Sequence, residues 1–179
     1  SMVDGPTRQL GRIGFGICVV DAHGTIVGLG LGVPPRWVRS VFGAEAWALK
    51  VATSVAEPGV AFRTDCLGVA NTVRRGRKWA TSADRPLARL WALVFAALDD
   101  HGDARSVDIA WLPAHTAQHA VGVALLSNGR LLTDTDRIGN TQADLLAKRG
   151  AETHRVPEHI RNDVKLRAEV AEFAAAALA

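Results

Sequence analysis

Four carboxylates of this chain stand where a strand is predicted to end or a helix to begin. They are Asp4, Glu45, Asp65 and Asp144. Acids that met at one edge of a sheet would repel one another strongly unless cations were present. Hard oxygen ligands suit Mg²⁺ or Mn²⁺, and two such ions can activate a water and stabilise the leaving oxygen in phosphodiester cleavage. The four acids therefore form a candidate metal site for cleaving nucleic acid.

Each of these residues also has an ordinary structural interpretation. Asp4 suits a turn, and Asp65 suits the cap of the helix that follows it. Glu45 and Asp144 are expected in the first turns of helices, where the helix dipole favours an acid. His115 follows a predicted strand and is a candidate for proton transfer or product release, with a structural loop histidine as the alternative. The chemistry depends on whether the fold brings the acids together.

The elements that must position these residues follow from the spacing of the apolar side chains. Alternating apolar residues predict strands, and apolar residues three and four apart predict helices. The expected order is a hairpin over residues 13–33, a helix over 44–55, a strand over 59–65, a short helix to about 75, a helix over 87–98, a strand over 106–112, a helix capped by Asn140 and a C-terminal helix from about 157. This order predicts an α/β fold in which helices pack on a mixed sheet.

Length and composition restrict the class of protein. The 179 residues suit one domain with a sizeable apolar core. No apolar run approaches membrane-spanning length and there is no signal peptide, so we expect no membrane partner and an intracellular location, cytoplasmic or nuclear. Cys18 and Cys66 lack metal-ligand spacing; they could form one disulfide, but free thiols in a reducing compartment are expected.

Basic residues gather between the short helix and the helix over residues 87–98. This stretch contains a single acid, Asp84, and suits either a solvated surface or a phosphate-binding arm. An aromatic side chain inside it could contact the backbone or a sugar of a nucleic acid. The candidate nucleic-acid-binding residues are Arg74, Arg75, Arg77, Lys78, Trp79 and Arg85.

Five short motifs, in their order and spacing, carry a resemblance to a known family. They are VDG at residues 3–5, AEAWAL at 44–49, TD at 64–65, WLPAHT at 111–116 and GNTQADLLAK at 139–148. In this arrangement the chain resembles type-1 ribonuclease H over residues 3 to about 152. The resemblance implies a ribonuclease H-like fold, in which a mixed five-stranded sheet is flanked by helices.

The same resemblance implies a divalent-metal-dependent endoribonuclease that cleaves the RNA strand of RNA–DNA hybrids. It carries over Asp4, Glu45, Asp65 and Asp144 as ligands of two Mg²⁺ or Mn²⁺ ions, and His115 as a mobile histidine. We expect a monomer, and a diverged domain from a retroelement polyprotein is one origin that the pattern suggests. The alternatives are a nuclease of the same fold with another nucleic-acid substrate, or an inactive domain that binds nucleic acid or protein. Four acids close together are costly without metal, which argues against the inactive domain.

Some positions depart from the family pattern. Val41-Phe42-Gly43 stands where the family usually has two asparagines that contact the minor groove of the hybrid, and Leu67 stands where it often has a glutamine. Such polar groups help to read the 2′-hydroxyl that marks RNA. We therefore expect poorer discrimination between a hybrid and double-stranded RNA. Only three residues precede Asp4, so a short first strand is also expected.

Two segments fall outside the pattern. We expect a ribonuclease H-like domain at residues 1–155, with an insertion at about 116–139, and a C-terminal helical extension at 156–179. The insertion contains a possible capping box from Thr133 to Asp136, and it suits a lid, a partner surface or a simple insertion. Apolar residues of the extension suggest that it docks on the domain or on a partner.

Overall fold

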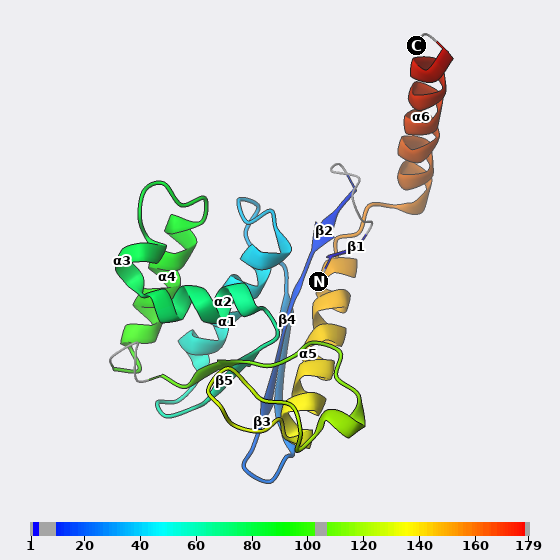
Figure 1. The fold of residues 1–179 in the computed structure, drawn as a ribbon. Helices are drawn as coiled ribbons and strands as arrows, with labels where there is room; N and C mark the ends of the chain where they lie inside the picture. Colours follow the sequence, from blue (N-terminus) through cyan, green and yellow to red (C-terminus); the bar gives the residue numbers. More distant parts are fainter. Residues whose placement is uncertain (1, 4–9, 103–106, 178–179) are drawn as a thin grey trace.

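The protein is an α/β structure in which helices lie on both sides of a long hairpin (Figure 1). The computed structural model describes residues 2–3, 10–102 and 107–177. The strands are β1 (Met2–Val3), β2 (Arg12–Ile13), β3 (Phe15–Val20), β4 (Ile26–Gly32), β5 (Phe62–Thr64) and β6 (Ile109–Trp111). The helices are α1 (Val41–Val55), α2 (Leu67–Arg75), α3 (Arg77–Ala80), α4 (Ala88–Asp99), α5 (Asp134–Glu152) and α6 (Glu158–Ala177), with a short 3-10 helix η1 at Gln118–Ala120.

The predicted hairpin is formed by β3 and β4, which pair antiparallel with one register shift, between Val19 opposite Gly28 and Val20 opposite Ile26. The Asp21 carboxylate closes its turn, because Oδ1 accepts hydrogen bonds from the backbone N–H groups of His23 and Thr25, each at 2.8 Å. This pairing of a side chain with the backbone two residues on is the reason that aspartate favours turns. The hairpin predicted over residues 13–33 is therefore confirmed.

Helix α5 lies directly on β3, and two glycines make the close approach possible. A Cβ atom at Gly16 would lie 2.0 Å from the carbonyl oxygen of Ala143, and one at Gly14 would also collide with the α5 backbone. Leu146 and Ala147 of α5 are buried at this contact. Both belong to the apolar helical face that the sequence predicted, although the helix extends further than expected.

The largest core lies on the other side of the hairpin, where α1 packs against α4. The apolar face predicted for α4 is confirmed, since its large side chains are fully or almost fully buried. Burying an apolar side chain of this size contributes about 1.5–3 kcal/mol. The α4 members of this core are Leu90, Trp91, Val94, Phe95 and Leu98.

The expected five-stranded sheet is not present among the residues that the structure describes. These residues form three sheets of two strands each, which pair β1 with β2, β3 with β4, and β5 with β6. The β5–β6 pair is parallel, with Phe62 opposite Ile109. Strand β1 contributes only two residues and pairs Met2 with Ile13. Among the described residues β1 pairs with β2 only, so no described strand links the hairpin to the parallel pair, whereas the coarser α/β description holds.

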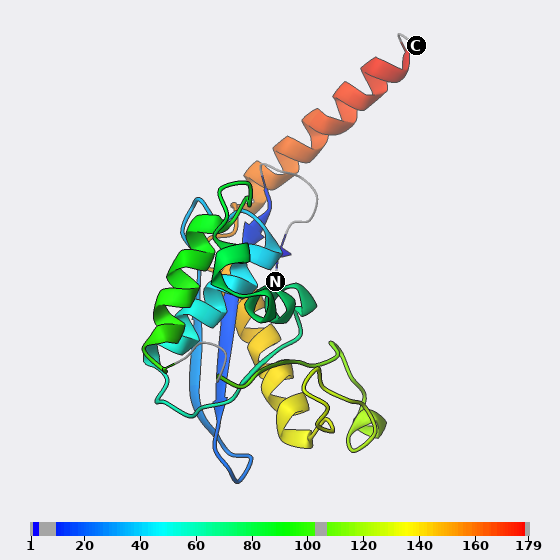
Figure 2. The same ribbon diagram turned by 60° about the vertical axis from the view of Figure 1, so that its left-hand side comes forward.

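The two segments outside the family pattern differ in position. The inserted loop joins a second small core, in which Leu126 and Leu132 are buried with Ala110 and Leu112. Helix α6 extends away from the rest of the molecule, as two views show (Figures 1 and 2). Across residues 2–3, 10–102 and 107–177, no helix combines the length and the apolar character needed to cross a membrane.

Candidate active site

Two of the predicted acids, Asp65 and Asp144, lie close enough to a third, Glu45, for their charges to act on it. Glu45 lies on α1, Asp65 directly follows β5, and Asp144 lies on α5. Burial raises the pKa of Glu45 above its ordinary value, and the negative charges of Asp65 and Asp144 raise it further. Elements that are distant in the sequence thus bring these carboxylates into one region.

The negative charges of two of these acids also act on the thiol of Cys66. Burial raises the pKa of its thiol, and the carboxylates of Glu45 and Asp65 raise it further, against backbone hydrogen bonds that lower it. A thiol with a raised pKa stays protonated and is a poor nucleophile. Cys66 is therefore a neutral neighbour of the acids, a position that no pattern in the sequence predicts.

Glu45 occupies the second turn of its helix, so the expectation of a first-turn acid is wrong. Helix α1 begins at Val41, where the Ser40 hydroxyl accepts a hydrogen bond from the Gly43 N–H at 3.0 Å. The first turn of α1 contains no acid. Because the effect of the helix dipole falls off beyond the first turn, it explains Glu45 less well than the sequence suggested.

Asp65 is fixed by contacts from two other elements. Its backbone oxygen accepts a hydrogen bond from the Trp111 indole Nε1 at 3.0 Å, and its Oδ2 accepts one from the Asn140 amide at 3.4 Å. The cap residue of α2 is Cys66, so the expected role of Asp65 as a helix cap does not hold. The carboxylate is instead turned toward α5.

Asp144 lies in the interior of α5, and its placement in a first turn is wrong. The helix begins at Asp134 and is capped by Thr133, so Asn140 is not a cap. The Lys148 Nζ lies 2.8 Å from Asp144 Oδ2. Asn140 and Lys148 stand four residues before and after Asp144, which places all three on one helical face. That spacing of four residues is visible in the sequence and is the signal that identifies both residues as neighbours of Asp144.

Of the two remaining predicted site residues, only His115 is among the described residues, and it is not brought into this group. Asp4 lies outside the described residues. His115 lies in an exposed turn after β6, with a φ of 50°, which is uncommon for a residue other than glycine. In the described part of the chain, His115 makes no hydrogen bond or ion pair with Glu45, Asp65 or Asp144.

The chemistry of this donor set fits a hard divalent cation. Carboxylate oxygens are the ligands that Mg²⁺ and Mn²⁺ favour, and their mutual repulsion is relieved by a cation. As the side chains stand, no three acidic, histidine or cysteine side chains within residues 2–3, 10–102 and 107–177 are arranged to hold an ion together. Glu45, Asp65 and Asp144 thus supply the right type of ligand, but within the described residues their side chains are not arranged as a metal site.

The basic segment, residues 74–85, contains side chains that contact different partners. The Trp79 ring lies between two guanidinium groups, Arg75 at 4.5 Å and Arg85 at 4.0 Å from its centroid. Arg77 turns the other way, where it forms an ion pair with Asp99 and donates to the Phe95 carbonyl at 2.8 Å. Cation–π contacts at partly exposed sites are worth about 0.5–1 kcal/mol each.

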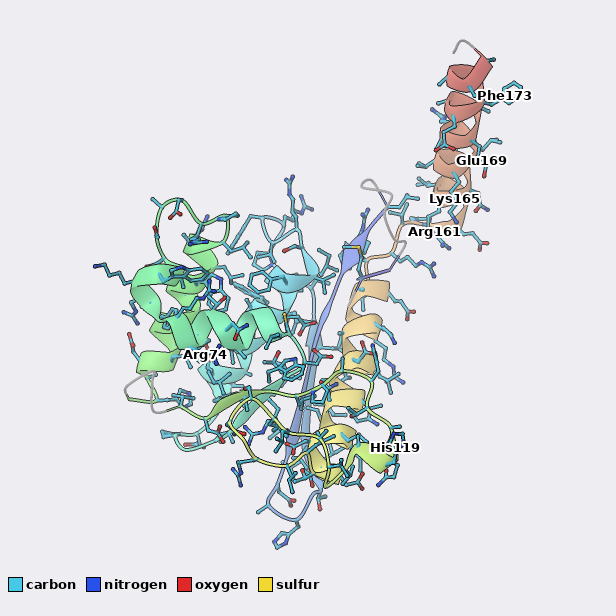
Figure 3. All side chains as sticks on the ribbon, in the orientation of Figure 1. Arg74, His119, Arg161, Lys165, Glu169 and Phe173 are labelled. Carbon is cyan, nitrogen blue, oxygen red and sulfur yellow. The ribbon has the colours of Figure 1, made fainter. Side chains whose placement is uncertain are left out.

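An open pocket of about 420 Å³ lies beside this tryptophan. Its walls carry three cationic side chains, and one acid stands among them. The pKa of this acid, Asp84, lies below its ordinary value because the Ser82 hydroxyl donates to it. Arg74 lies on α2 beside the segment, where it donates to Asn71 Oδ1 at 2.9 Å (Figure 3). The lining residues are Arg75, Lys78, Trp79, Ser82, Asp84 and Arg85.

Comparison of the chain with protein-family models, with curated proteins and with solved structures found no match.

Proposed function

We propose that this protein is a divalent-metal-dependent endoribonuclease of the ribonuclease H type, which cleaves the RNA strand of RNA–DNA hybrids. The observation that carries the proposal is the electrostatic grouping of Glu45, Asp65 and Asp144. These acids come from a helix, a strand end and a second helix, and no single turn or cap explains all three. The motif resemblance supplies the reaction type, the ribonuclease H-like fold and the fourth acid, Asp4.

The three carboxylates would hold Mg²⁺ or Mn²⁺, with Asp4 as a further ligand. Bound there, two such ions would activate a water and stabilise the leaving oxygen of the phosphodiester. The Asn140 amide holds the Asp65 carboxylate, and Lys148 holds that of Asp144, so both acids are oriented by residues of α5. His115 would assist proton transfer or product release from its exposed turn.

The basic segment would hold the substrate through its phosphates. Arg75, Lys78 and Arg85 line one pocket, and their positive charge attracts a polyanion of any sequence. Arg77 contributes less to this surface, because Asp99 and the Phe95 carbonyl engage its guanidinium. We therefore expect the segment to set affinity and salt dependence rather than choice of sequence.

A second candidate, a nuclease of the same fold with a broader substrate range, is favoured by a specific contact. The Phe42 ring packs over Gly68, where an added Cβ would lie 2.8 Å from the ring, and it lies 6.1 Å from the Trp91 ring. Val41 and Leu67 on either side are exposed. These apolar groups offer no side-chain hydrogen bond to a ribose hydroxyl, so rejection of double-stranded RNA would be weak.

Cleavage by an Asp65→Asn variant tests the reaction and the substrate together. Loss of one anionic ligand should abolish Mg²⁺-dependent cleavage, while the exposed Glu57→Gln change should leave it intact. The assay compares hybrid, double-stranded RNA and double-stranded DNA at one salt concentration. We expect the hybrid to be cut, with appreciable cutting of double-stranded RNA. Full activity of Asp65→Asn would contradict the site, and cleavage of the hybrid alone would contradict the broader range.

The pH dependence of stability tests the acid grouping without an assay of activity. Because the pKa of Glu45 is raised in the folded protein, that state binds the proton more tightly than the unfolded chain does. Stability should therefore fall as pH rises from the ordinary glutamate pKa through the raised one. Glu45→Gln should remove this loss and be more stable at pH 7, as measured by urea unfolding without metal.

The control for this measurement is Glu57→Gln, which removes an exposed acid and should leave the profile unchanged. Added Mg²⁺ should stabilise the unaltered protein more than Glu45→Gln, since a ligand that binds only the folded state raises its stability. An identical pH profile for Glu45→Gln and the unaltered protein would show that the pKa of Glu45 is not raised in the folded state, and would remove the observation on which the acid grouping rests.

A further inference from the structure

Strand β4 is paired along one edge only. It bonds to β3, and within residues 2–3, 10–102 and 107–177 no other backbone group bonds to its outer edge. An edge strand leaves alternate N–H and C=O groups unpaired, and these form a template for another strand. The outer edge of β4 is therefore able to accept a partner strand.

The sequence of β4 lacks charges and prolines, two of the features that usually prevent such pairing, although a register irregularity at Val27 interrupts its pairing with β3. The stretch from Thr25 to Val33 contains no charged residue and no proline, whereas edge strands are commonly protected by both. Its large side chains remain exposed although α5 lies on the same hairpin, with Val27 at 62 %, Leu29 at 59 % and Leu31 at 45 %. The alternating positions are glycines, which leave the opposite face of the strand flat.

We infer that β4 pairs antiparallel with β4 of a second copy of this chain, about a two-fold axis at Leu29. This register overlaps the whole strand, so Val27 of one copy faces Leu31 of the other and the two Leu29 side chains face each other. Residues directly opposite in an antiparallel pair lie on the same face. The exposed apolar side chains of both copies would then form one continuous row.

Charges at the two ends of β4 favour this antiparallel arrangement. Asp21 lies in the turn before the strand, and the exposed Arg36 and Arg39 follow its other end. Antiparallel pairing brings the acidic end of each copy toward the basic end of the other. Parallel pairing would bring like charges together, which is unfavourable. A two-fold dimer therefore accounts for both the exposed apolar row of β4 and the opposite charges at its two ends.

Sedimentation velocity over a range of concentrations tests the dimer with the full chain. The unaltered protein should shift from monomer to dimer as concentration rises. Leu29→Lys should weaken association at least about tenfold, because it sets two like charges directly opposite each other in the paired strands. Val55→Lys is the matched control, since Val55 is 74 % exposed at the end of α1 and should associate as the unaltered protein does.

Disulfide trapping tests the register even if the lysine variant fails to fold. In the proposed pair the two copies of residue 29 are opposite each other, about 4.5–5.5 Å apart between Cα atoms, within disulfide range. Residue 27 of one copy lies opposite residue 31 of the other, so the two copies of residue 27 are offset by four residues along the strands, roughly 13 Å. Cys18 lies opposite residue 29 within the hairpin, so both variants carry Cys18→Ser to prevent a disulfide inside one chain. In this background Leu29→Cys should form a covalent dimer on oxidation, and Val27→Cys should not. A monomer at every concentration, or trapping through residue 27 alone, would overturn the inference.

Discussion

The inserted loop and helix α6 both lie outside the ribonuclease H pattern, yet they relate to the rest of the molecule in opposite ways. The insertion is mostly irregular, but Leu126 and Leu132 within it are only 4 % and 1 % exposed. Helix α6 is regular over 20 residues, and none of its described residues is buried. Phe173 near its end is 78 % exposed and points away from the body (Figure 3). Regular backbone structure is therefore a poor guide to whether a segment belongs to the core.

The charged contacts of the insertion and of α6 also differ, because those near the insertion join separate elements and the one in α6 does not. Arg63 of β5 lies 3.3 Å from Asp136 at the start of α5 and 3.2 Å from Asp108, and Asn128 of the insertion also donates to Asp108 at 3.0 Å. These contacts join the inserted loop to the parallel strand pair. In α6, the ion pair of Arg167 with Asp163 at 3.0 Å stays within the helix. The insertion is thus held from several sides by contacts with other elements, whereas the ion pair of α6 is internal to the helix.

The largest effect is expected from a cavity under the insertion. Leu132→Ala removes a buried side chain and should lower the free energy of unfolding by about 2–5 kcal/mol. Its neighbour Leu131 is 51 % exposed, so Leu131→Ala should change stability by less than about 0.5 kcal/mol. Urea unfolding of both variants measures the contrast. Equal effects at the two positions would mean that the insertion is not packed as described.

A smaller effect is expected where the insertion enters α5. The Thr133 hydroxyl accepts a hydrogen bond from the Asp136 N–H at 3.1 Å, and the Asp136 carboxylate accepts one from the Thr133 N–H at 3.0 Å. Thr133→Ala should cost about 1 kcal/mol of stability, because it removes this cap. Thr133→Ser keeps the hydroxyl and should cost much less. If serine proves as harmful as alanine, the cap hydrogen bond is not the source of the loss.

The smallest effect is expected from removing α6. A chain that ends at Pro157 loses no buried side chain of α6, so its free energy of unfolding should change by less than about 0.5 kcal/mol. Thermal unfolding by circular dichroism, together with urea unfolding, measures this. A loss above about 1 kcal/mol would show that α6 packs on the body in solution, and the contrast between the two segments would disappear.

The sequence determined the elements that local spacing specifies. The apolar residues of α4 recur at three and four positions, and the alternating residues of the hairpin flank an aspartate turn, so each element could be predicted from its own residues. The candidate acids were also found this way, because Asp65 and Asp144 stand in recognisable short motifs. A local pattern suffices here because one face of each element must be apolar wherever the element packs.

Only the tertiary structure decided the start of α5 and the arrangement of the acids. The capping box at Thr133 was visible, but Gly139 and Asn140 interrupt the pattern as helix-weakening residues. They are helical because α5 is laid along β3, where Gly14 and Gly16 leave room for its backbone. The packing of α5 on β3 also determines that the helix face carrying Asn140 and Asp144 is turned toward Asp65. Packing between distant elements outweighs local propensity at such positions, and spacing along one chain segment does not contain that information.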